Sequence, residues 1–402
     1  MKNNKLKIVV AMSGGVDSSV AAALLKQQGY DIVGIFMKFW KSSFDDKKNG
    51  GWNRCCAFEA QQRARAVARV LNIPFYVLNL EKQFKSKVVD YFLQEARAGR
   101  TPNPCVICNK EIKFGLLLDK AMAMGADFVA TGHYARLLRE ILNPKSEILN
   151  KYKIQNLKSK TVFKILEAKD KNKDQSYFLW QLNQKQLSRI LLPIGEIASK
   201  AKARDLARKF NLPVAQTKES QEICFVKDKV AYFFKQTIEP KKGKITTKQG
   251  KAIGQHQGLW FYTIGQRKGL NLSQGPWFVV DKDIKNNNLI VSKNEKDLLQ
   301  KELIAENVNW ISGQEPKLPL KIKAKIRYRS ELASATVKEK IAAKKYKVVF
   351  SKPQRAITPG QSIVFYLLHR SPAVGGAKAG EASELLGGGI IELQIANLKM
   401  QN

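Results

Sequence analysis

The sequence has few of the features that secreted or membrane proteins need. Only five cysteines occur in 402 residues, and no apolar run approaches the ~20 residues that span a bilayer. The start of the chain, Met1–Lys5, lacks the apolar core of a signal peptide. An odd number of cysteines disfavours a disulfide framework and favours thiol chemistry or metal binding. We therefore expect a cytoplasmic protein without membrane contact.

Acidic residues are scarce relative to basic ones. The chain has 34 Asp and Glu against 70 Lys and Arg, which gives a net charge of +36. Such a charge attracts polyanions without specifying which one. A lysine-rich coding composition or a need for solubility would raise the charge too, so it favours nucleic acid without proving it. The length predicts two or three domains.

One phosphate-binding sequence lacks the lysine that would make it a Walker loop. Ser13-Gly-Gly-Val-Asp-Ser-Ser19 lies between an apolar strand at Lys7–Met12 and a helix expected at Val20–Gln28. Two glycines at a strand–helix junction allow backbone N–H groups to surround a phosphate at the helix N-terminus. No Gly-Lys-Ser/Thr follows. This pattern is typical of pyrophosphate-loop ATPases, which cleave ATP between the α- and β-phosphates and adenylate a substrate.

Alternating strands and helices in the first half predict an α/β domain with a parallel sheet. The expected strands are 31–38, 75–80 and 127–131, and the expected helices are 57–71, 83–98, 111–124, 183–191 and 201–210. A polar loop runs to residue 53, residues 139–175 resemble a surface hairpin or insertion, and 371–384 resemble a flexible loop. From about residue 241 short β-prone runs predict an all-β tail with a small barrel, at 260–264, 277–280, 289–291, 321–328, 346–350 and 362–367.

A second sequence feature combines prolines with two thiols. Thr101-Pro-Asn-Pro-Cys-Val-Ile-Cys-Asn109 should form a stiff, extended loop that presents Cys105 and Cys108 just before a helix. A helix N-terminus lowers the pKa of a nearby thiol and so increases its nucleophilic thiolate. Zinc sites, iron–sulfur sites and redox motifs share the Cys-x-x-Cys spacing. The adjacent pair Cys55-Cys56 suits tetrahedral zinc poorly, and Cys224 on its own is as expected of a buried structural cysteine.

With these segments together, the chain resembles the tRNA-specific 2-thiouridylases, which place sulfur on the wobble uridine of certain tRNAs. The resemblance spans nearly the whole chain in order. It rests on the loop, the cysteine motif, the segment before Phe225 and further motifs: Ala130-Thr-Gly-His-Tyr-Ala135, Asn172-Lys-Asp-Gln-Ser-Tyr-Phe178, Gly254-Gln-His-Gln-Gly258, Thr263-Ile-Gly-Gln-Arg-Lys-Gly269, Val279-Val-Asp-Lys-Asp283, Ile326-Arg-Tyr-Arg329, Thr358-Pro-Gly-Gln-Ser362 and Leu386–Ile391.

The resemblance implies a role for particular residues. Cys108 matches the nucleophile of the family and Cys224 its persulfide-bearing cysteine. The residues implied to bind ATP are Ala11, Met12, Ser13, Gly14, Gly15, Val16, Asp17, Ser18, Met37 and Gly132. The residues implied to contact tRNA are Asn103, Pro104 and Cys105 at the target base, together with Lys173, Asp174, Gln175, Arg327 and Tyr328. Lys173 could equally lie in a solvated turn and Arg327 on an ordinary exposed strand. His133 receives no chemical role.

The resemblance also implies a reaction and a domain order. A uridine in position 34 of tRNA is adenylated by ATP, with Mg²⁺ expected, and a Cys224 persulfide replaces AMP by sulfur. The tRNAs that read Lys, Glu and Gln codons are the expected substrates, with a cysteine desulfurase or sulfur-relay protein as donor. We expect an adenine-nucleotide alpha hydrolase-like domain at 1–218, a central tRNA-binding domain at 219–300 and a C-terminal β-barrel at 301–402.

Three alternatives remain open at this point. Cys105 stands where some family members carry Asp, so Cys105, Cys108 and Cys224 could instead hold an iron–sulfur cluster that binds sulfide. Another pyrophosphate-loop enzyme, such as a tRNA lysidine- or amide-forming ligase, would transfer nitrogen and would not need paired thiols. A tRNA-binding protein with a degenerate site would produce no AMP. No metal ligand set other than the three cysteines is predicted.

Overall fold

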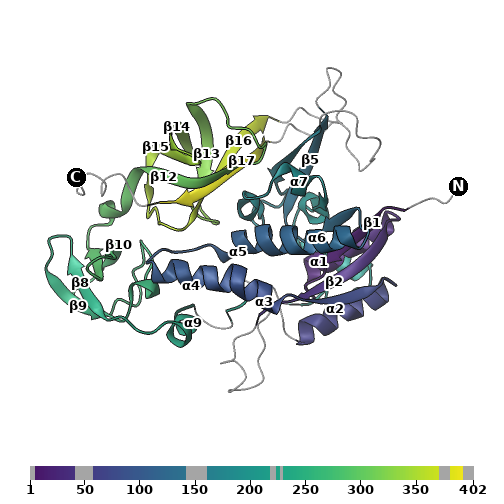
Figure 1. The fold of residues 1–402 in the computed structure, drawn as a ribbon, viewed down its shortest axis with the longest axis horizontal. Coiled ribbons are helices and arrows are strands. Elements are labelled where there is room, and N and C mark those ends of the chain that lie inside the picture. Colours follow the sequence, from purple (N-terminus) through teal and green to yellow (C-terminus); the bar gives the residue numbers. More distant parts are fainter. Residues whose placement is uncertain are drawn as a thin grey trace.

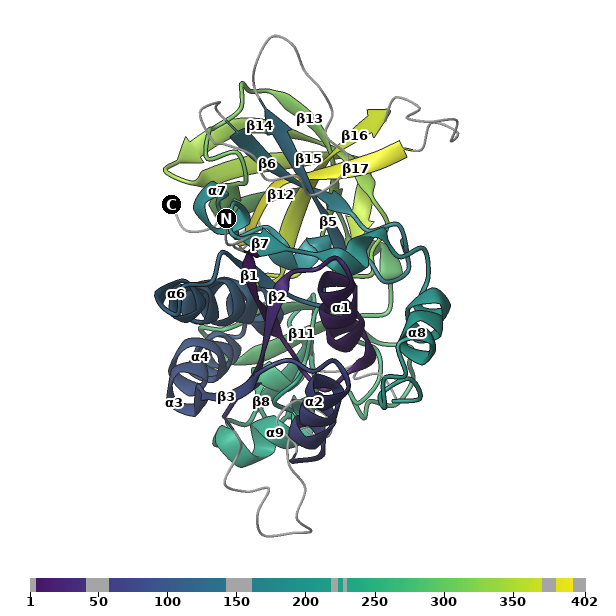
Figure 2. The ribbon, with the colours of Figure 1, turned by 90° about the vertical axis from the view of Figure 1, so that its right-hand side faces the viewer.

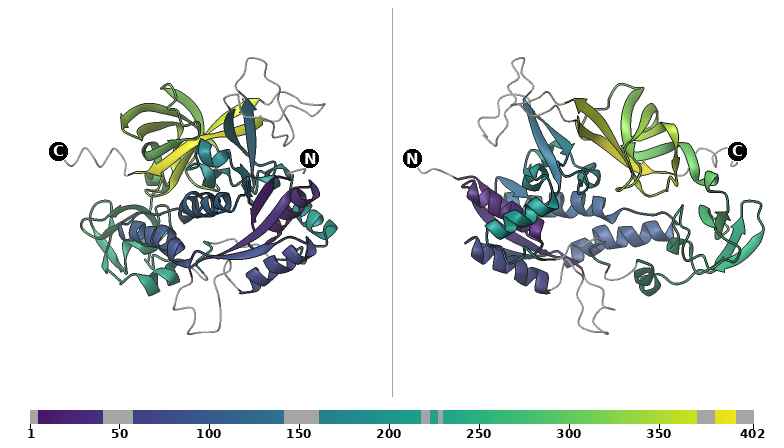
Figure 3. Two further views of the ribbon diagram at one scale, coloured as in Figure 1. Left: turned by 45° about the vertical axis from the view of Figure 1, so that its right-hand side comes forward. Right: turned by 180° about the vertical axis from the view of Figure 1, so that it is seen from behind.

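The computed structural model describes residues 5–40, 58–141, 161–217, 223–226, 230–370 and 381–392. Their secondary structure forms a parallel α/β unit, a small central sheet and a barrel (Figure 1). The central sheet lies at the opposite end of the molecule from the first strands of the parallel sheet (Figure 3). Within the described ranges, no helix has both the length and the apolar character needed to cross a bilayer.

The N-terminal sheet has five parallel strands in the order β3-β2-β1-β4-β7. They are β1 (Lys7–Ala11), β2 (Asp31–Lys38), β3 (Phe75–Asn79), β4 (Phe128–Ala130) and β7 (Ile190–Leu191). β1 and β2 are continuous apolar runs because helices cover both faces of the sheet. The predicted α/β domain is confirmed.

The helices divide between the two faces of this sheet (Figure 2). Val20, Ala64 and Ala203 share one core with β1 and β2, and Leu117 shares the core on the other face with Val9. The helices that contribute these residues are α1 (Val16–Gln27), α2 (Phe58–Val70), α8 (Lys200–Lys209) and α6 (Leu117–Ala123). A further helical stretch runs through α3 (Glu81–Phe84), η2 (Lys85–Val89) and α4 (Asp90–Arg97), close to the helix predicted there.

The second half of the chain forms two β units. The central sheet has the order β10-β11-β8-β9, with β8 (Gly243–Thr247), β9 (Ala252–His256), β10 (Phe278–Asp283) and β11 (Asn288–Ser292). The barrel closes because its first strand pairs with its last. Its strands are β12 (Leu299–Trp310), β13 (Leu320–Lys325), β14 (Ala333–Ala342), β15 (Lys345–Arg355), β16 (Ser362–Arg370) and β17 (Glu381–Ile391). The predicted barrel is confirmed.

A hairpin from the first half extends the barrel sheet. β5 (Ala135–Ile141) and β6 (Thr161–Glu167) pair with each other, and β6 pairs antiparallel with β17 through Ile165 and Leu166. The hairpin therefore joins the parallel sheet to the barrel and fixes the segment that follows it. The sequence predicted a surface hairpin here without this second role.

The helix that carries the cysteine motif starts earlier than predicted. α5 (Pro104–Ile107) leads directly into a π-helical stretch, η3 (Cys108–Leu116), and then into α6. A helix had been expected only from Glu111, after an extended loop. Proline fits the first helical turn because its missing N–H would have no partner there, so Pro104 starts the helix. Cys105 and Cys108 consequently lie within the helix.

Three other predicted elements were wrong. Residues 260–264 form no strand: Trp260 and Phe261 belong to a 3₁₀ turn, η6 (Leu259–Phe261), because they pack on the core around α9 (Val230–Thr237). The helix predicted at 183–191 is only α7 (Gln184–Leu187), after which the chain enters β7. The flexible loop predicted to 384 ends earlier, since β17 begins at Glu381. The rest of that loop and the polar loop at 41–53 lie outside the described residues.

Short turns complete the described chain. They are η4 (Ser176–Leu179), η5 (Pro193–Glu196) and η7 (Glu295–Leu298). η4 directly follows Gln175, whose backbone N–H donates to the Tyr134 carbonyl at 2.7 Å. This bond holds the segment before η4 against the loop after β4.

Candidate functional site

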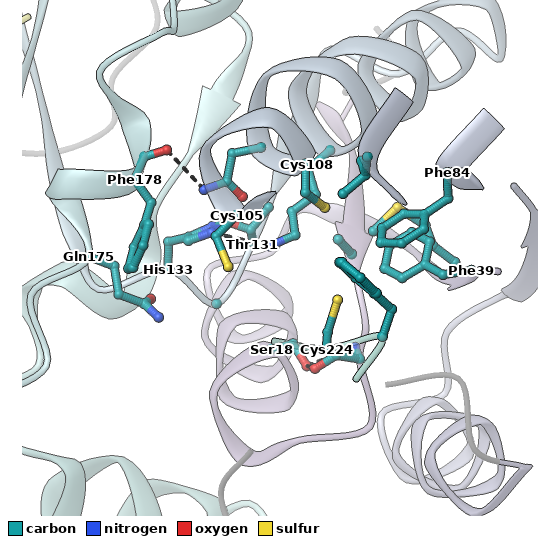
Figure 4. Close-up of a pocket in the computed structure, with 18 of the residues that line it drawn as sticks. Ser18, Phe39, Phe84, Cys105, Cys108, Thr131, His133, Gln175, Phe178 and Cys224 are labelled. Atoms are coloured by element: carbon teal, nitrogen blue, oxygen red, sulfur yellow. Dashed lines mark hydrogen bonds between the residues drawn. The ribbon is translucent and has the colours of Figure 1, made fainter. Parts of the chain in front are cut away.

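A cavity of about 300 Å³ lies at the carboxyl ends of β1, β2 and β4. Parallel sheets bind ligands at this edge. Its walls come from the β1–α1 loop, β2, the α5–η3 helix, the loop after β4 and the segment around Cys224 (Figure 4). One wall thus carries the glycine-rich loop and another carries thiols.

Hydroxyl groups hold the β1–α1 loop in shape. The Ser13 N–H donates to Ser18 Oγ at 3.1 Å, and Ser19 Oγ donates to the Gly15 carbonyl at 2.8 Å. The helix α1 starts at the next residue, Val16. The first N–H groups of a helix have no partner within it and carry partial positive charge, so the start of α1 suits a phosphate.

Two glycines bring the surrounding backbone close to this loop. Gly14 has a φ of +75°, and a Cβ there would lie 2.1 Å from the Ala60 carbonyl oxygen of α2. A Cβ on Gly132, in the loop after β4, would lie 2.6 Å from the Ser18 nitrogen. Neither position has space for a side chain. The loop after β4 therefore packs directly on the start of α1.

Asp17 forms an ion pair beside the loop. Both of its carboxylate oxygens accept from Lys200 Nζ at 2.7 Å, and one also accepts from Tyr134 Oη at 2.8 Å. The ammonium of Lys200 offsets the negative charge that Asp17 would otherwise present to a bound phosphate. Sequence reasoning missed Lys200, because it lies 183 positions from Asp17 and no local pattern marks it.

Three cysteines contribute to the cavity. Cys108 is 5% exposed within an apolar cluster, whereas Cys105 and Cys224 are partly exposed. The Cys224 side chain points toward the helix that carries Cys108 (Figure 4). Phe84 and Phe225 pack together at this end with ring centroids 5.7 Å apart. The thiol wall, formed by η3 and the segment around Cys224, is therefore largely apolar around Cys108 and Cys224, and Asn109 and Lys113 add polar groups elsewhere on it.

Metal binding finds little support in the described part of the chain. There, no group of three or more His, Cys, Asp or Glu residues is placed to hold a metal ion. The proposed cluster on Cys105, Cys108 and Cys224 would need such a group. Cys55 and Cys56 lie outside the described residues.

Lys113 and His133 form a polar contact that sequence reasoning did not identify. Lys113 Nζ lies 3.4 Å from His133 Nε2, and His133 Nδ1 lies 2.7 Å from Thr131 Oγ1. An ammonium only donates, so Nε2 accepts and Nδ1 donates to the hydroxyl. Burial, and then the charge of Lys113, hold the pKa of His133 well below its ordinary value. His133 is thus neutral, and its contact with Lys113 helps to position the Lys113 ammonium in the cavity wall.

The structure brings most of the predicted site residues together. The cavity is lined by Ala11, Met12, Ser13, Asp17, Ser18, Met37, Gly132, Pro104, Cys105, Cys108, Gln175 and Cys224. Gly14, Gly15 and Val16 shape the adjoining loop, and Asn103 precedes α5 as its N-cap. The other predicted residues, Lys173, Asp174, Arg327 and Tyr328, do not line the cavity.

Two of these outlying residues bond within the protein. Asp174 is 5% exposed and accepts from the Ala168 N–H at 3.0 Å and Ser176 Oγ at 2.8 Å. Burial raises its pKa above the ordinary value. Arg327 donates to two carbonyl groups and to Thr358 Oγ1 at 2.7 Å, and burial lowers its pKa.

Tyr328 supports the cavity from behind. Its ring centroid lies 4.4 Å from that of Phe178, which does line the cavity. Together with the bonds of Asp174 and Arg327, this contact gives the outlying residues a structural function. Whether they also contact tRNA stays a prediction.

Comparison with known proteins covers almost the whole chain. Residues 6–228 match the family described as tRNA methyl transferase HUP domain, 231–293 the tRNA methyl transferase PRC-barrel domain and 300–391 the aminomethyltransferase beta-barrel domain. The "tRNA-specific 2-thiouridylase MnmA" of Shouchella clausii is 43% identical over 97% of this chain and 98% of its own length. The protein of the same name from Clostridioides difficile is 44% identical over 96% and 98%.

Solved structures are less similar. A predicted subunit of tRNA methyltransferase from Methanocaldococcus jannaschii is 16% identical, with a TM-score of 0.28 over 50% of this chain and 76% of its own. That likeness is too low to support an argument. The two relatives named above, by contrast, cover 96–97% of this chain and place it in their family.

Proposed function

The chain belongs to the family of tRNA-specific 2-thiouridylases, and we propose that it adenylates a tRNA uridine and then replaces AMP by sulfur. Its activity is that of a tRNA sulfurtransferase acting at C2 of uridine. The observation that carries the two-step proposal is the shared cavity, which has a phosphate-binding loop on one wall and three cysteines on another.

Adenylation is the first proposed step. The carbonyl oxygen on C2 of uridine is a poor leaving group. Attack of this oxygen on the α-phosphorus of ATP, with loss of the N3 proton to solvent, forms a neutral O2-adenylated base and releases pyrophosphate; N3 regains a proton when the 2-thio product forms. The start of α1 would hold the pyrophosphate, because its N–H groups face a charge that grows during this step. Ser13 and Ser18 would add hydroxyl donors.

Sulfur transfer is the second proposed step. The terminal sulfur of a Cys224 persulfide attacks C2, AMP leaves, and C2 becomes joined to Cys224 through two sulfur atoms. The Cys108 thiolate then attacks the Cys224 sulfur, which breaks the S–S bond, releases 2-thiouridine and leaves a Cys108–Cys224 disulfide. An external thiol reductant must reduce that disulfide before the next cycle. The low polarity of this wall would exclude water from the adenylate.

The cofactor and the partners complete the proposal. Mg²⁺ commonly keeps several waters and binds substrate phosphates, so it would be held here chiefly by the phosphates of ATP. The substrate would be the wobble uridine (position 34) of the tRNAs for Lys, Glu and Gln. The net charge of +36 would attract the tRNA backbone, and an unpaired anticodon base can leave its stack to enter the cavity. A cysteine desulfurase or relay protein would supply the persulfide sulfur.

An anaerobic assay with ATP, unmodified tRNA, a thiol reductant, and a cysteine desulfurase with cysteine as the source of persulfide sulfur tests the proposal. We expect 2-thiouridine in the digested tRNA, formed only with ATP and accompanied by AMP and pyrophosphate. Iron in the protein, at a cluster stoichiometry and needed for activity, would contradict the persulfide step. AMP without thiolated tRNA would leave only the adenylation step standing and would favour nitrogen transfer.

A further inference from the structure

Asn109 has an unused acceptor in the cavity wall. The residue is 2% exposed and lies beside Cys108 on η3. Its Oδ1 is buried, and no donor among the described residues contacts it. Leaving a buried acceptor without a donor is unfavourable, so an atom of this kind in a cavity wall calls for a functional explanation such as a donor on a bound ligand.

A hydrogen bond to Phe178 fixes which atom of this amide lacks a partner. Asn109 Nδ2 donates to the Phe178 carbonyl at 3.1 Å, a bond drawn as a dashed line in Figure 4. If the amide were turned over, two oxygens would face each other at that distance. The Nδ2 position is therefore set, and Oδ1 remains an acceptor without a donor on a residue that lines the cavity.

The acceptor matches one atom of the target base. Uracil carries an N–H at N3, next to the C2 carbon that reacts, whereas cytosine carries a lone pair at N3. An amide oxygen bonds the first and repels the second. A site built to accept such a hydrogen bond rejects an analogue that lacks the donor.

We propose that Asn109 selects uridine as the base binds, by accepting a hydrogen bond from uracil N3–H before adenylation removes that proton. This inference rests on the proposed function. The reacting C2 must enter the cavity to meet the Cys224 persulfide, and Asn109 and Cys224 line that same cavity. The phosphate-binding groups, Ser13 and Ser18, belong to the β1–α1 loop on another wall. A donor on the base is thus the group that this acceptor is placed to meet.

The test compares wild type and Asn109→Leu on two tRNAs that differ only in a wobble uridine or cytidine. Leucine has nearly the same shape as asparagine but has no acceptor. We expect kcat/KM for uridine to fall about 10- to 100-fold and that for cytidine to change less than about threefold. The selectivity ratio should then fall by the same factor, with KM for ATP unchanged. Masses of 2-thiouridine and 2-thiocytidine give the two rates.

Gln181→Leu is the matched control. Gln181 Oε1 is also buried without a donor among the described residues, but Gln181 does not line the cavity. This variant should keep the wild-type selectivity ratio. Melting temperatures of both variants identify any general loss of folding.

Three results would overturn the inference. An unchanged selectivity ratio in Asn109→Leu would make Asn109 structural only, and an unchanged ratio with a raised KM for ATP would assign Oδ1 to the nucleotide. Equal binding of uridine and cytidine anticodon stem–loops by wild type would also exclude it. If wild type makes no 2-thiouridine, the proposed function fails, and the stem–loop affinities of wild type and Asn109→Leu still test this inference.

Discussion

The two walls of the cavity are built in different ways. The wall formed by the β1–α1 loop and the start of α1, called the phosphate wall below, uses backbone groups. Glycines and local hydrogen bonds to hydroxyl groups, such as that from Ser13 N–H to Ser18 Oγ, fix these groups. The thiol wall uses side chains from two distant segments, with Cys108 on η3 and Cys224 in a short turn. A wall made of backbone tolerates no added volume, whereas a wall made of side chains depends on the chemistry of single atoms. Substitutions should therefore separate the two steps of the reaction.

Loss of a thiol should give the largest effect. We expect Cys108→Ser and Cys224→Ser to lower 2-thiouridine formation by at least about 10³-fold, because serine can neither carry the persulfide nor resolve it. Pyrophosphate release in a single turnover should stay within about threefold of wild type, because adenylation precedes any reaction of the thiols. Mass analysis of tRNA and an assay of released pyrophosphate measure the two products. Loss of both products together would show that the walls do not act separately.

Cys105→Asp sharpens the same test. If sulfur is transferred from a Cys224 persulfide, Cys105 does not carry the transferred sulfur atom. The Cys105→Asp variant should then retain a rate of 2-thiouridine formation within about tenfold of wild type. A cluster held by three cysteines would lose one ligand and most of its activity. The same assay measures Cys105→Asp and Cys108→Ser, and both substitutions lie in the same continuous helical segment.

Added volume on the phosphate wall should have the next largest effect. In Gly132→Ala the new methyl group would lie 2.6 Å from the Ser18 nitrogen and 2.8 Å from the Asp17 carbonyl carbon, both backbone atoms. The start of α1 must then move, and we expect AMP and 2-thiouridine to fall together by about 10²-fold. Gly15→Ala is the control, because its methyl group meets only Ser13 Oγ at 3.5 Å and should cost less. Loss of thiolation alone in Gly132→Ala would contradict this account.

Removing the cation beside Asp17 should have a moderate effect. Lys200→Met leaves the carboxylate unneutralised near the phosphates, so we expect KM for ATP to rise about 5- to 10-fold. The steady-state rate of AMP formation against ATP concentration measures it. Lys202→Met, on the exposed side of α8, should keep the wild-type KM. An unchanged KM in Lys200→Met would mean that Asp17 does not face the phosphates.

Lys282 lies at a cavity away from both walls and should affect stability only. It is 8% exposed, and its Nζ donates to the Gly99 carbonyl at 2.9 Å. Burial lowers its pKa from 10.5 to about 8. Between these pKa values the unfolded chain binds more protons than the folded chain. The contribution of Lys282 to the free energy of unfolding therefore rises with pH. Below pH 8 Lys282 is charged in the folded chain, and the full free-energy cost of burying that charge lowers the stability of the fold.

The expected size of this pH effect is about 2–3 kcal/mol between pH 8 and 10.5. Urea unfolding of wild type and Lys282→Met across this range measures it, and the stability of wild type relative to the variant should rise with pH. A constant difference would show that the amine is not held charged and buried. Neither reaction step should change in Lys282→Met at pH 7.5.

The sequence predicted the phosphate wall better than the thiol wall. Ser13–Ser19 is a local pattern, since the glycines, the strand before them and the helix after them are consecutive. The alternation of strands and helices gave the parallel sheet for the same reason. Cys224 could be placed opposite Cys108 only through the family resemblance, because no local pattern joins residues so far apart.

Other features depended on tertiary contacts that a sequence does not display. The ion pair of Lys200 with Asp17 and the pairing of β6 with β17 both join distant segments. Aromatic residues at 260–261 resembled a strand, but they serve as core anchors in a 3₁₀ turn. Pro104 was interpreted as a loop residue although proline also begins helices. The domain boundaries at 218 and 300 stay predictions.

One measurement tests the central claim that the two walls serve two successive steps on one base. Protein loaded with sulfur by a desulfurase is freed of donor and mixed with ATP and tRNA for a single turnover. We predict that the Cys224 peptide loses its extra sulfur as 2-thiouridine appears in equal amount, and that neither change occurs without ATP. Thiolation with the extra sulfur still on Cys224, or sulfur loss without ATP, would contradict the account.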